Sequence, residues 1–325
     1  MILRVSPRLR QVERLTTGWL LVLLVAVSLE FLKWMRVRST RGIELYEGAK
    51  DHCVFSASQD AATGSRVHSV GTLPQIIAAD TGNGAPLLLV SATDVEVQAV
   101  LNMVPGALST VIGNRTYYDL GMVGRTQTYL VQATGMGPTG VRSCIEEGIR
   151  VLAPCALILV GIAFGLRPEH QQIGDILLSR QVQDYDPQRW GLGDDQEVVI
   201  YGRGNRVAAT EWLLDRFIAG KHRWTGTARI QTGLLLSGSL LVDHPGVRDQ
   251  LRHLAPEALG GEMEAATLCD LAQRHHVSWI AVKAISDWAD GNKCQHEQEH
   301  QRLAAEHAAR FVLYVIGQPG FLPRA

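Results

Sequence analysis

The chain has 325 residues, which is enough for one large domain or two modest ones. Its apolar fraction of 46% and charged fraction of 19% are typical of a globular protein and exclude a disordered chain. The net charge of −1 gives no electrostatic support for nucleic-acid binding, and five cysteines without a CxxC pair favour free thiols over a disulfide framework.

The N-terminal 35 residues consist of a basic arm and a dense apolar run. Residues 18–29 are almost all apolar, arginines precede them, and lysine and arginine follow them. Trp19 and Trp34 stand at the two ends, where interfacial anchors are found. We expect residues 18–34 to form an apolar membrane-anchor helix, although the run is shorter than the usual span of about 20 residues. A cleaved signal peptide and a helix packed on a partner subunit are the alternatives.

Residues 36–85 are irregular and rich in Ser, Thr, Gly and Asp clusters, so they are predicted to be a linker. From residue 86 to residue 325 the pattern changes to alternating strands and helices, which predicts one catalytic domain. The expected strands are 87–91, 116–123, 126–133, 156–160, 175–179, 228–237 and 278–285. The expected helices are 94–103, 138–152, 208–219, 264–275 and 301–316. Short apolar runs alternating with helices predict an α/β fold with a mixed central sheet flanked by helices.

Four groups of residues stand at the expected strand ends, where α/β enzymes build their sites. Glu96 lies one turn into the first helix, and Gly135-Met136-Gly137 separates a strand from a helix. Glu262-Met263-Glu264 precedes another helix, and Ser286-Asp287 follows a strongly apolar strand. Each group alone has a structural explanation: a solvated helix residue, a tight turn or a helix cap.

Together, in this order and spacing, the motifs resemble the nucleoside phosphorylase and nucleosidase superfamily. Within it they are most similar to the methylthioadenosine/adenosylhomocysteine nucleosidase branch. The resemblance runs from about residue 87 to about residue 316. The motifs that carry it are Ala92-x-x-x-Glu96-Val, Gly161-x-Ala163-x-Gly165-Leu, Gly174-Asp175-Ile, Ser237-Gly238, Glu262-Met263-Glu264-Ala and Ile285-Ser286-Asp287-x-Ala-Asp290.

The resemblance implies that the enzyme breaks the bond between a purine and its ribose. Asp287 would protonate the purine at N7, and Ser286 would orient Asp287. Glu264 would accept hydrogen bonds from the ribose hydroxyls, and Met263 would pack on the sugar face. Glu96 would position and deprotonate the attacking water. The remaining expected substrate-binding residues are Glu262, which would support that water, together with Gly135, Gly137, Gly161, Ala163, Leu241 and Val242.

Hydrolysis is favoured over phosphorolysis. The segment Ser91–Asp94 carries no arginine, and the predicted loop from Val160 to Gly165 has the apolar Ile162 where relatives often have a hydroxyl. An apolar side chain cannot satisfy phosphate oxygens, and Glu96 would repel a phosphate dianion. Phosphorolysis stays open because positive charge could come from Arg115, Arg125 or Arg142.

Two positions depart from the nucleosidase pattern and leave the substrate open. Leu241 stands where relatives have an aromatic residue stacked on adenine, and Lys283 stands where many have arginine. Fusion to an apolar N-terminal segment is similar to bacterial immune effectors that attack adenine nucleotides such as ATP. Arg203, Arg206 and Lys293 are the candidates for contacting a 5′ phosphate.

The resemblance implies a purine nucleoside or nucleotide substrate, a homo-oligomer of at least two chains, and no metal or organic cofactor. His296 and His300 are assigned to a solvated helical face. We expect the catalytic domain on the cytoplasmic side of an inner membrane. A non-catalytic nucleoside sensor is the alternative from another class, but a sensor has no need of the acid at Asp287.

Overall fold

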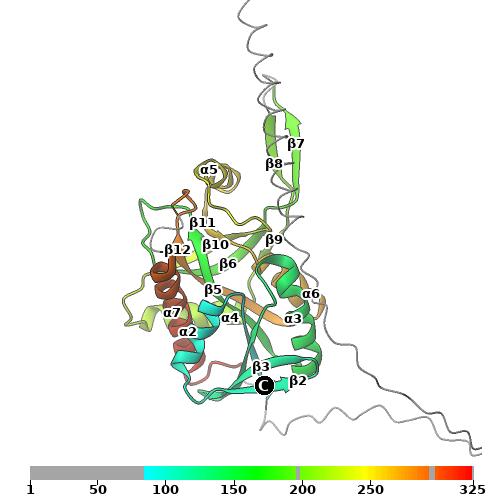
Figure 1. Ribbon diagram of the computed structural model, residues 1–325, viewed down its shortest axis with the longest axis vertical. Coiled ribbons are helices and arrows are strands. Elements are labelled where there is room, and N and C mark those ends of the chain that lie inside the picture. The colour runs from blue at the N-terminus through cyan, green and yellow to red at the C-terminus, as the bar shows by residue number, and fades with distance from the viewer. Residues whose placement is uncertain (1–83, 195–197, 293–296, 324–325) are drawn as a thin grey trace, which may run out of the picture. The chain divides into compact units, whose positions relative to one another are not determined.

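The computed structural model describes residues 84–194, 198–292 and 297–323 (Figure 1). The expected anchor at 18–34 and nearly all of the expected linker lie outside these residues. Within the described part of the chain, no helix is long and apolar enough to cross a membrane.

The described chain forms an α/β structure built on a ten-stranded sheet and a separate two-stranded ribbon. The strands are β1 (Leu87–Ser91), β2 (Leu108–Ile112), β3 (Arg115–Val123), β4 (Thr126–Gln132), β5 (Ala156–Gly165), β6 (Ile176–Asp184), β7 (Gln188–Leu192), β8 (Val198–Gly202), β9 (Arg206–Ala208), β10 (Ile230–Ser237), β11 (Ala258–Glu262) and β12 (Ser278–Asp287). The helices are α2 (Asp94–Met103), α3 (Gly137–Leu152), α4 (Glu211–Arg223), α5 (Pro245–Leu254), α6 (Ala265–Arg274) and α7 (Glu297–Ile316). The predicted α/β fold with a mixed central sheet flanked by helices is confirmed.

The sheet has the strand order β11-β10-β6-β12-β5-β1-β4-β3-β2, with β9 added to β6. Strand β5 runs parallel to both β1 and β12, and every residue of β1 is buried. Such strands are covered on both faces, which explains their continuous apolar runs. The end of β5 also pairs antiparallel with β11, so β11, β10, β6, β12 and β5 form a closed ring of strands.

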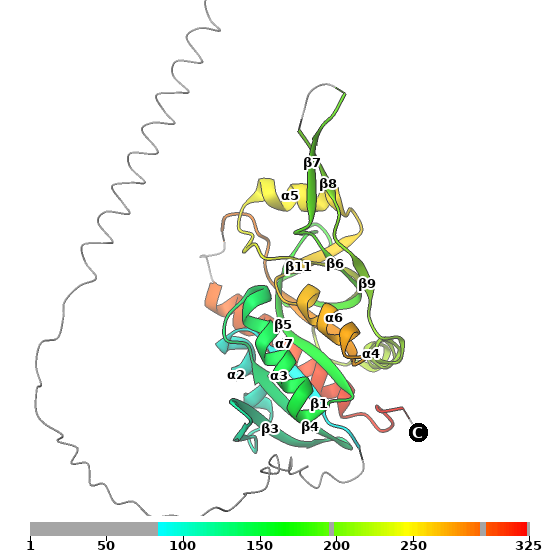
Figure 2. The same ribbon diagram turned by 90° about the vertical axis from the view of Figure 1, so that its right-hand side faces the viewer.

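Helices cover both faces of the sheet. Helices α2 and α7 pack together, and α7 lies on β5 and β12. Helices α3 and α6 lie together on the other face, as the two views show (Figures 1 and 2). The main core between these layers includes the apolar residues of β1, β5 and β12 together with residues of the covering helices. This arrangement leaves the carboxyl ends of β1, β5 and β12 at one edge of the sheet.

Three strands continue beyond their predicted ends. The predicted loop from Val160 to Gly165 was wrong, because this segment belongs to β5. Its backbone pairs with β12 from Val160 to Phe164 and with β11 at Phe164 and Gly165. Strand β12 continues to Asp287 through a bulge after Ile285, and β6 continues to Asp184. Functional residues therefore lie on sheet backbone where loops were expected.

The β7–β8 ribbon and α5 were not predicted. The ribbon projects from the main sheet in both views (Figures 1 and 2). Trp190, Leu192 and Val198 on it are exposed. The glycines and acidic residues between its strands indicated an irregular connection, which concealed the strand pairing between residues 188–192 and 198–202.

Candidate active site

One pocket gathers most of the predicted site residues at the carboxyl ends of β1, β5, β11 and β12. Nine of the twelve predicted positions line it: Glu96, Ala163, Leu241, Val242, Glu262, Met263, Glu264, Ser286 and Asp287. The other lining residues are Ala92, Thr93, Met136, Ile162, Phe164, Leu240, Gly261 and Gln301. Segments far apart in the sequence thus contribute to a single cavity, as a site built on a sheet edge requires.

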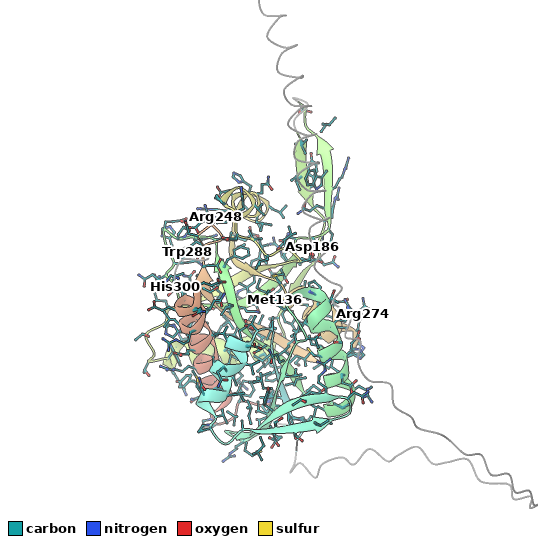
Figure 3. The ribbon with its side chains drawn as sticks, in the orientation of Figure 1. Met136, Asp186, Arg248, Arg274, Trp288 and His300 are labelled. Carbon is teal, nitrogen blue, oxygen red and sulfur yellow. The ribbon has the colours of Figure 1, made fainter. Side chains whose placement is uncertain are left out.

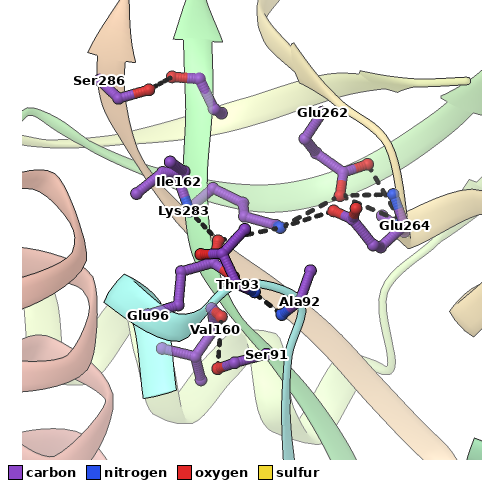
Figure 4. A network of polar contacts seen from close by, with 12 residues as sticks. Ser91, Ala92, Thr93, Glu96, Val160, Ile162, Glu262, Glu264, Lys283 and Ser286 are labelled. Carbon is purple, nitrogen blue, oxygen red and sulfur yellow. Dashed lines mark hydrogen bonds and ion pairs between the residues drawn. The ribbon is translucent and has the colours of Figure 1, made fainter. Parts of the chain in front are cut away.

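Glu96 lines this pocket and is only 2% exposed, so its explanation as a solvated helix residue was wrong. Its Oε2 accepts hydrogen bonds from the backbone N–H groups of Ala92 (2.8 Å) and Thr93 (2.9 Å) (Figure 4). Its Oε1 accepts one from the backbone N–H of Ile162 (2.7 Å). A buried carboxylate needs such donors, and three of them fix both oxygens in place.

Gly161 provides the room for this carboxylate. A Cβ at position 161 would overlap Oε1 of Glu96 and would lie 3.0 Å from Nζ of Lys283. Gly161 does not line the pocket itself. Its predicted direct contact with substrate stays a prediction, while the structure gives it a clear part in the placement of Glu96.

Lys283 is fully buried and faces three carboxylates (Figure 4). Its Nζ lies 3.1 Å from Oε2 of Glu264, 3.4 Å from Oε2 of Glu262 and 4.0 Å from Oε1 of Glu96. Burial opposes the charged ammonium, but the attraction of Glu264, Glu262 and Glu96 raises the pKa of Lys283. The site therefore holds a permanent positive charge beneath its acids.

Glu264 is fixed from two sides. Its Oε1 accepts a hydrogen bond from the backbone N–H of Gly137 (2.9 Å), and its Oε2 accepts one from Lys283 (3.1 Å). Burial alone would raise the pKa of Glu264, yet the charge of Lys283 and these hydrogen bonds hold that pKa below its ordinary value. Gly137 has a φ of +81°, a conformation that favours glycine, and this turn aims its N–H at Glu264. Glu264 is thus an ionised acceptor beside the pocket.

Glu262 is held by backbone hydrogen bonds at the start of α6, which the sequence did not indicate. Its Oε2 accepts from the backbone N–H of Glu264 (3.0 Å), and its Oε1 accepts from that of Ala265 (3.0 Å). These donors are at the start of α6, where a carboxylate is favoured by the helix dipole. Burial raises the pKa of Glu262, with Lys283 opposing the rise. The carboxylate therefore caps α6 and touches the pocket at the same time.

Asp287 is the last residue of β12 and lines the pocket. Its Oδ2 accepts a hydrogen bond from Oγ of Ser286 (2.8 Å), and its Oδ1 accepts one from the backbone N–H of Ala289 (3.0 Å). Oγ of Ser286 also lies 3.3 Å from the carbonyl oxygen of Ala163 on β5. Both carboxyl oxygens are oriented, which agrees with the predicted orienting role of Ser286.

Neighbouring loops hold the segment that follows Asp287. The Arg248 guanidinium on α5 donates to the carbonyl oxygen of Trp288 (3.3 Å; residues labelled in Figure 3), and Gly291 N–H donates to Oδ1 of Asp243 (3.0 Å). Asp243 directly follows Leu241 and Val242, which are predicted substrate-binding residues. These two hydrogen bonds link the segment after Asp287 to α5 and to the loop that carries Leu241 and Val242.

Gly135 and Gly137, at the start of α3, do not line the pocket, and Met136 between them does. Gly137 acts through Glu264, as described above. Gly135 packs closely against Gly140, and a Cβ on Gly140 would overlap the carbonyl oxygen of Gly135. Met136 is 55% exposed (Figure 3) and forms part of the pocket's rim. Direct substrate contacts of Gly135 and Gly137 stay predictions.

Sequence reasoning missed two main features of the site. Lys283 was noted only as a departure from a pattern, although a lone cation inside the apolar strand 279–285 signals a buried ion pair. Phe164 was overlooked because residues 161–165 were treated as a loop.

The described lining residues include no Arg, Lys or His. Arg206 forms an ion pair with Glu257 (2.7 Å), Arg142 approaches Asp270 (3.8 Å), and Arg115 donates to Ser143 (3.0 Å). Arg125 and Arg203 do not line the pocket either, and Lys293 and His296 lie outside the described residues. The described lining of the pocket is therefore acidic, and it includes no cationic side chain that could bind phosphate oxygens.

The chain belongs to the phosphorylase superfamily, whose family model matches residues 86–317. It is 27% identical over 234 residues to a 5′-methylthioadenosine/S-adenosylhomocysteine nucleosidase from Glaesserella parasuis, covering 70% of this chain and 96% of the relative. It is 23% identical over 300 residues to a death domain-containing ATP nucleosidase from Amphimedon queenslandica, covering 81% of this chain but only 55% of that relative's length.

A solved structure has the same fold. The 5′-methylthioadenosine/S-adenosylhomocysteine nucleosidase from Neisseria meningitidis, in complex with methylthio-immucillin-A, superposes with a TM-score of 0.62 at 21% identity. The match covers 72% of this chain and 99% of that chain. The predicted superfamily membership is confirmed.

Proposed function

We propose that the protein is a hydrolase that cleaves the N-glycosidic bond between adenine and ribose in an adenine nucleoside or nucleotide. The observation that carries this proposal is the placement of three acids in one pocket. All three line it: Asp287 is oriented by Ser286, Glu264 is ionised, and Glu96 has both oxygens fixed. The names of the relatives from Glaesserella parasuis and Amphimedon queenslandica support a nucleosidase activity.

Each acid has a defined part in the reaction. Glu264 accepts hydrogen bonds from the ribose 2′- and 3′-hydroxyls. Asp287 donates a proton to N7 as the bond between N9 and C1′ breaks, so the purine leaves as a neutral base. Water adds its oxygen to C1′, and Glu96 takes the proton that this water releases. Proton exchange with solvent then restores Asp287 and Glu96, and the products are the free base and ribose with a hydroxyl at C1′.

Water is a better nucleophile for this pocket than phosphate. The carboxyl groups of Glu96, Glu262 and Glu264 face a single ammonium group, and Glu264 carries a negative charge because its pKa is lowered. A phosphate dianion would meet that charge without any cation among the described lining residues, and its desolvation would be uncompensated. A neutral water molecule meets neither this electrostatic repulsion nor the desolvation penalty of a dianion.

The sequence supports a more particular role. The apolar segment at residues 18–34 and the likeness to an ATP nucleosidase favour a membrane-tethered effector that depletes ATP-type nucleotides, with its catalytic domain on the cytoplasmic side. A second copy of the chain would complete the exposed rim at Met136 and Leu240. A 5′ triphosphate would need cations from outside the described pocket lining, and Arg203, Arg206 and Lys293 remain the candidates in this chain.

The deciding experiment is chromatographic detection of free base. The panel contains methylthioadenosine, adenosylhomocysteine, adenosine, inosine, AMP and ATP, each with and without phosphate, and Asp287→Asn is the control. Adenine released by the native protein without phosphate supports the proposal, and the best substrate defines the role. Release only with phosphate would make the protein a phosphorylase, and binding without any release would make it a sensor.

A further inference from the structure

Phe164 is the one aromatic residue among the described residues that line the pocket. It belongs to β5, lines the pocket and is only 7% exposed. At Leu241, where related nucleosidases are expected to place an aromatic residue, this chain has an aliphatic side chain that is 55% exposed. The aromatic surface of the pocket is therefore provided by another strand.

The strand pairing places Phe164 next to the proposed acid. Phe164 is the partner of Asp287 across β5 and β12, directly after the bulge that follows Ile285. On its other side, β5 pairs with β11, where Phe164 is the partner of Gly261. Phe164 thus lies between the strand that carries the acid and the strand that leads to Glu262 and Glu264.

Gly261 has no side chain where the ring of Phe164 lies. A Cβ on Gly261 would overlap Cζ of the ring and would lie 2.7 Å from Cε1. The ring also packs in a small hydrophobic cluster with Val242 and Ala289. Val242 is a predicted substrate-binding residue, and Ala289 lies in the loop that follows Asp287. Backbone and core therefore hold the ring rigidly in one position beside the cavity.

Resting on the proposed function, we propose that Phe164 forms the aromatic wall against which the purine base packs, in place of the aromatic residue absent at 241. A purine presents an apolar ring face, and aromatic contacts add to the binding free energy beyond simple burial. Because the ring is immobilised before the base arrives, little conformational entropy is lost on binding. Phe164 is then a specificity-determining residue for the leaving group.

The test measures adenine binding by isothermal titration calorimetry and nucleoside cleavage by chromatography, using the full chain. Phe164→Leu should weaken adenine binding about 3- to 10-fold and raise KM accordingly. Leu236→Val is the matched control, because Leu236 is buried in the same hydrophobic cluster and does not line the pocket. It should leave adenine binding unchanged even if it lowers the melting temperature.

Two further variants separate base contact from general packing. Leu241→Phe, added to Phe164→Leu, should restore adenine binding by returning an aromatic ring to the pocket from the other side. Gly261→Ala should weaken binding in the native background and have a smaller effect in Phe164→Leu, since its Cβ then meets a smaller side chain.

Adenine binding by Phe164→Leu equal to that of the native protein would overturn the inference. An equal loss in Phe164→Leu and Leu236→Val, without rescue by Leu241→Phe, would also overturn it, because the effect would then come from packing. A native protein that neither binds nor releases adenine would instead refute the proposed function itself.

Discussion

Nζ of Lys283 lies 3.1 Å from Oε2 of Glu264, and both side chains are almost completely excluded from solvent. The ion pair is the centre of the site, because the same ammonium group also faces Glu262 and Glu96. Its position explains how three carboxylates remain at the base of one small pocket. Without it, burial would favour the protonated form of Glu264.

Removal of the ammonium group should therefore destabilise the whole domain. Lys283→Met is expected to lower the free energy of unfolding by about 3–5 kcal/mol, because buried carboxylates lose their compensating charge. Chemical denaturation at neutral pH measures this. Arg274→Met is the control, since Arg274 pairs with Asp270 at the surface and its loss should cost less than about 1 kcal/mol. Equal losses in the two variants would contradict the central role of Lys283.

The same pair predicts a pH dependence of stability. The folded protein holds the pKa of Glu264 below its unfolded value, which is about 4.3. The contribution of ionised Glu264 is thus fully present above that value and is lost as the pH falls through the lower folded pKa.

The stability difference between the native protein and Glu264→Gln should shrink on acidification below about pH 4.3. Denaturant unfolding between pH 6 and pH 3 would measure it. Glu146→Gln, at an exposed position, is the control: the difference between its free energy of unfolding and that of the native protein should stay constant over this pH range. A Glu264→Gln difference that grows on acidification would show that the sign is wrong.

Glu96→Gln tests the proposed water-activating carboxylate. An amide can present only one oxygen, so its NH2 group must face either the N–H of Ile162 or those of Ala92 and Thr93. We expect the free energy of unfolding to fall by about 1–3 kcal/mol. Turnover should fall by about 10²- to 10⁴-fold through loss of the base.

Asp94→Asn provides the matched control for Glu96→Gln. Asp94 is exposed in the first turn of the same helix, and it accepts a hydrogen bond from Gln132 outside the pocket. Its substitution should leave turnover within about twofold, in line with the small effects of surface changes. Near-native turnover in folded Glu96→Gln would remove Glu96 from the mechanism.

The motif spacing in the sequence singled out Glu96, Glu264 and Asp287, and the structure brings the three into one pocket. Their catalytic roles stay predictions, and the structure around them was not predicted. Phe164 and the β7–β8 ribbon were missed for a physical reason: their segments carry glycines or turn residues, and only pairing with distant strands makes them extended. Local patterns contain no information on such long-range pairing.

The membrane anchor expected at residues 18–34 can be tested directly. The full chain should sediment with membranes and be released by detergent but not by high salt, because burial of apolar surface is insensitive to screening. Leu24→Arg should move protein to the soluble fraction, because a cation at the centre of a span costs about 2.5–3.5 kcal/mol. Full release of the native chain by salt alone would refute the anchor.

Gly161→Ala tests whether the backbone, and not only the acids, defines the site. The added Cβ would overlap Oε1 of Glu96, and the β5 backbone is held at Gly161 by its pairing with Lys283 on β12. Glu96 must therefore move, so we expect turnover to fall by at least about tenfold with a loss of about 1–3 kcal/mol in unfolding free energy. Gly106→Ala is the control, because no atom lies within 4 Å of the new Cβ. A fully active Gly161→Ala variant would show that the position of Glu96 is not critical, and the role assigned to its three backbone hydrogen bonds would have to be abandoned.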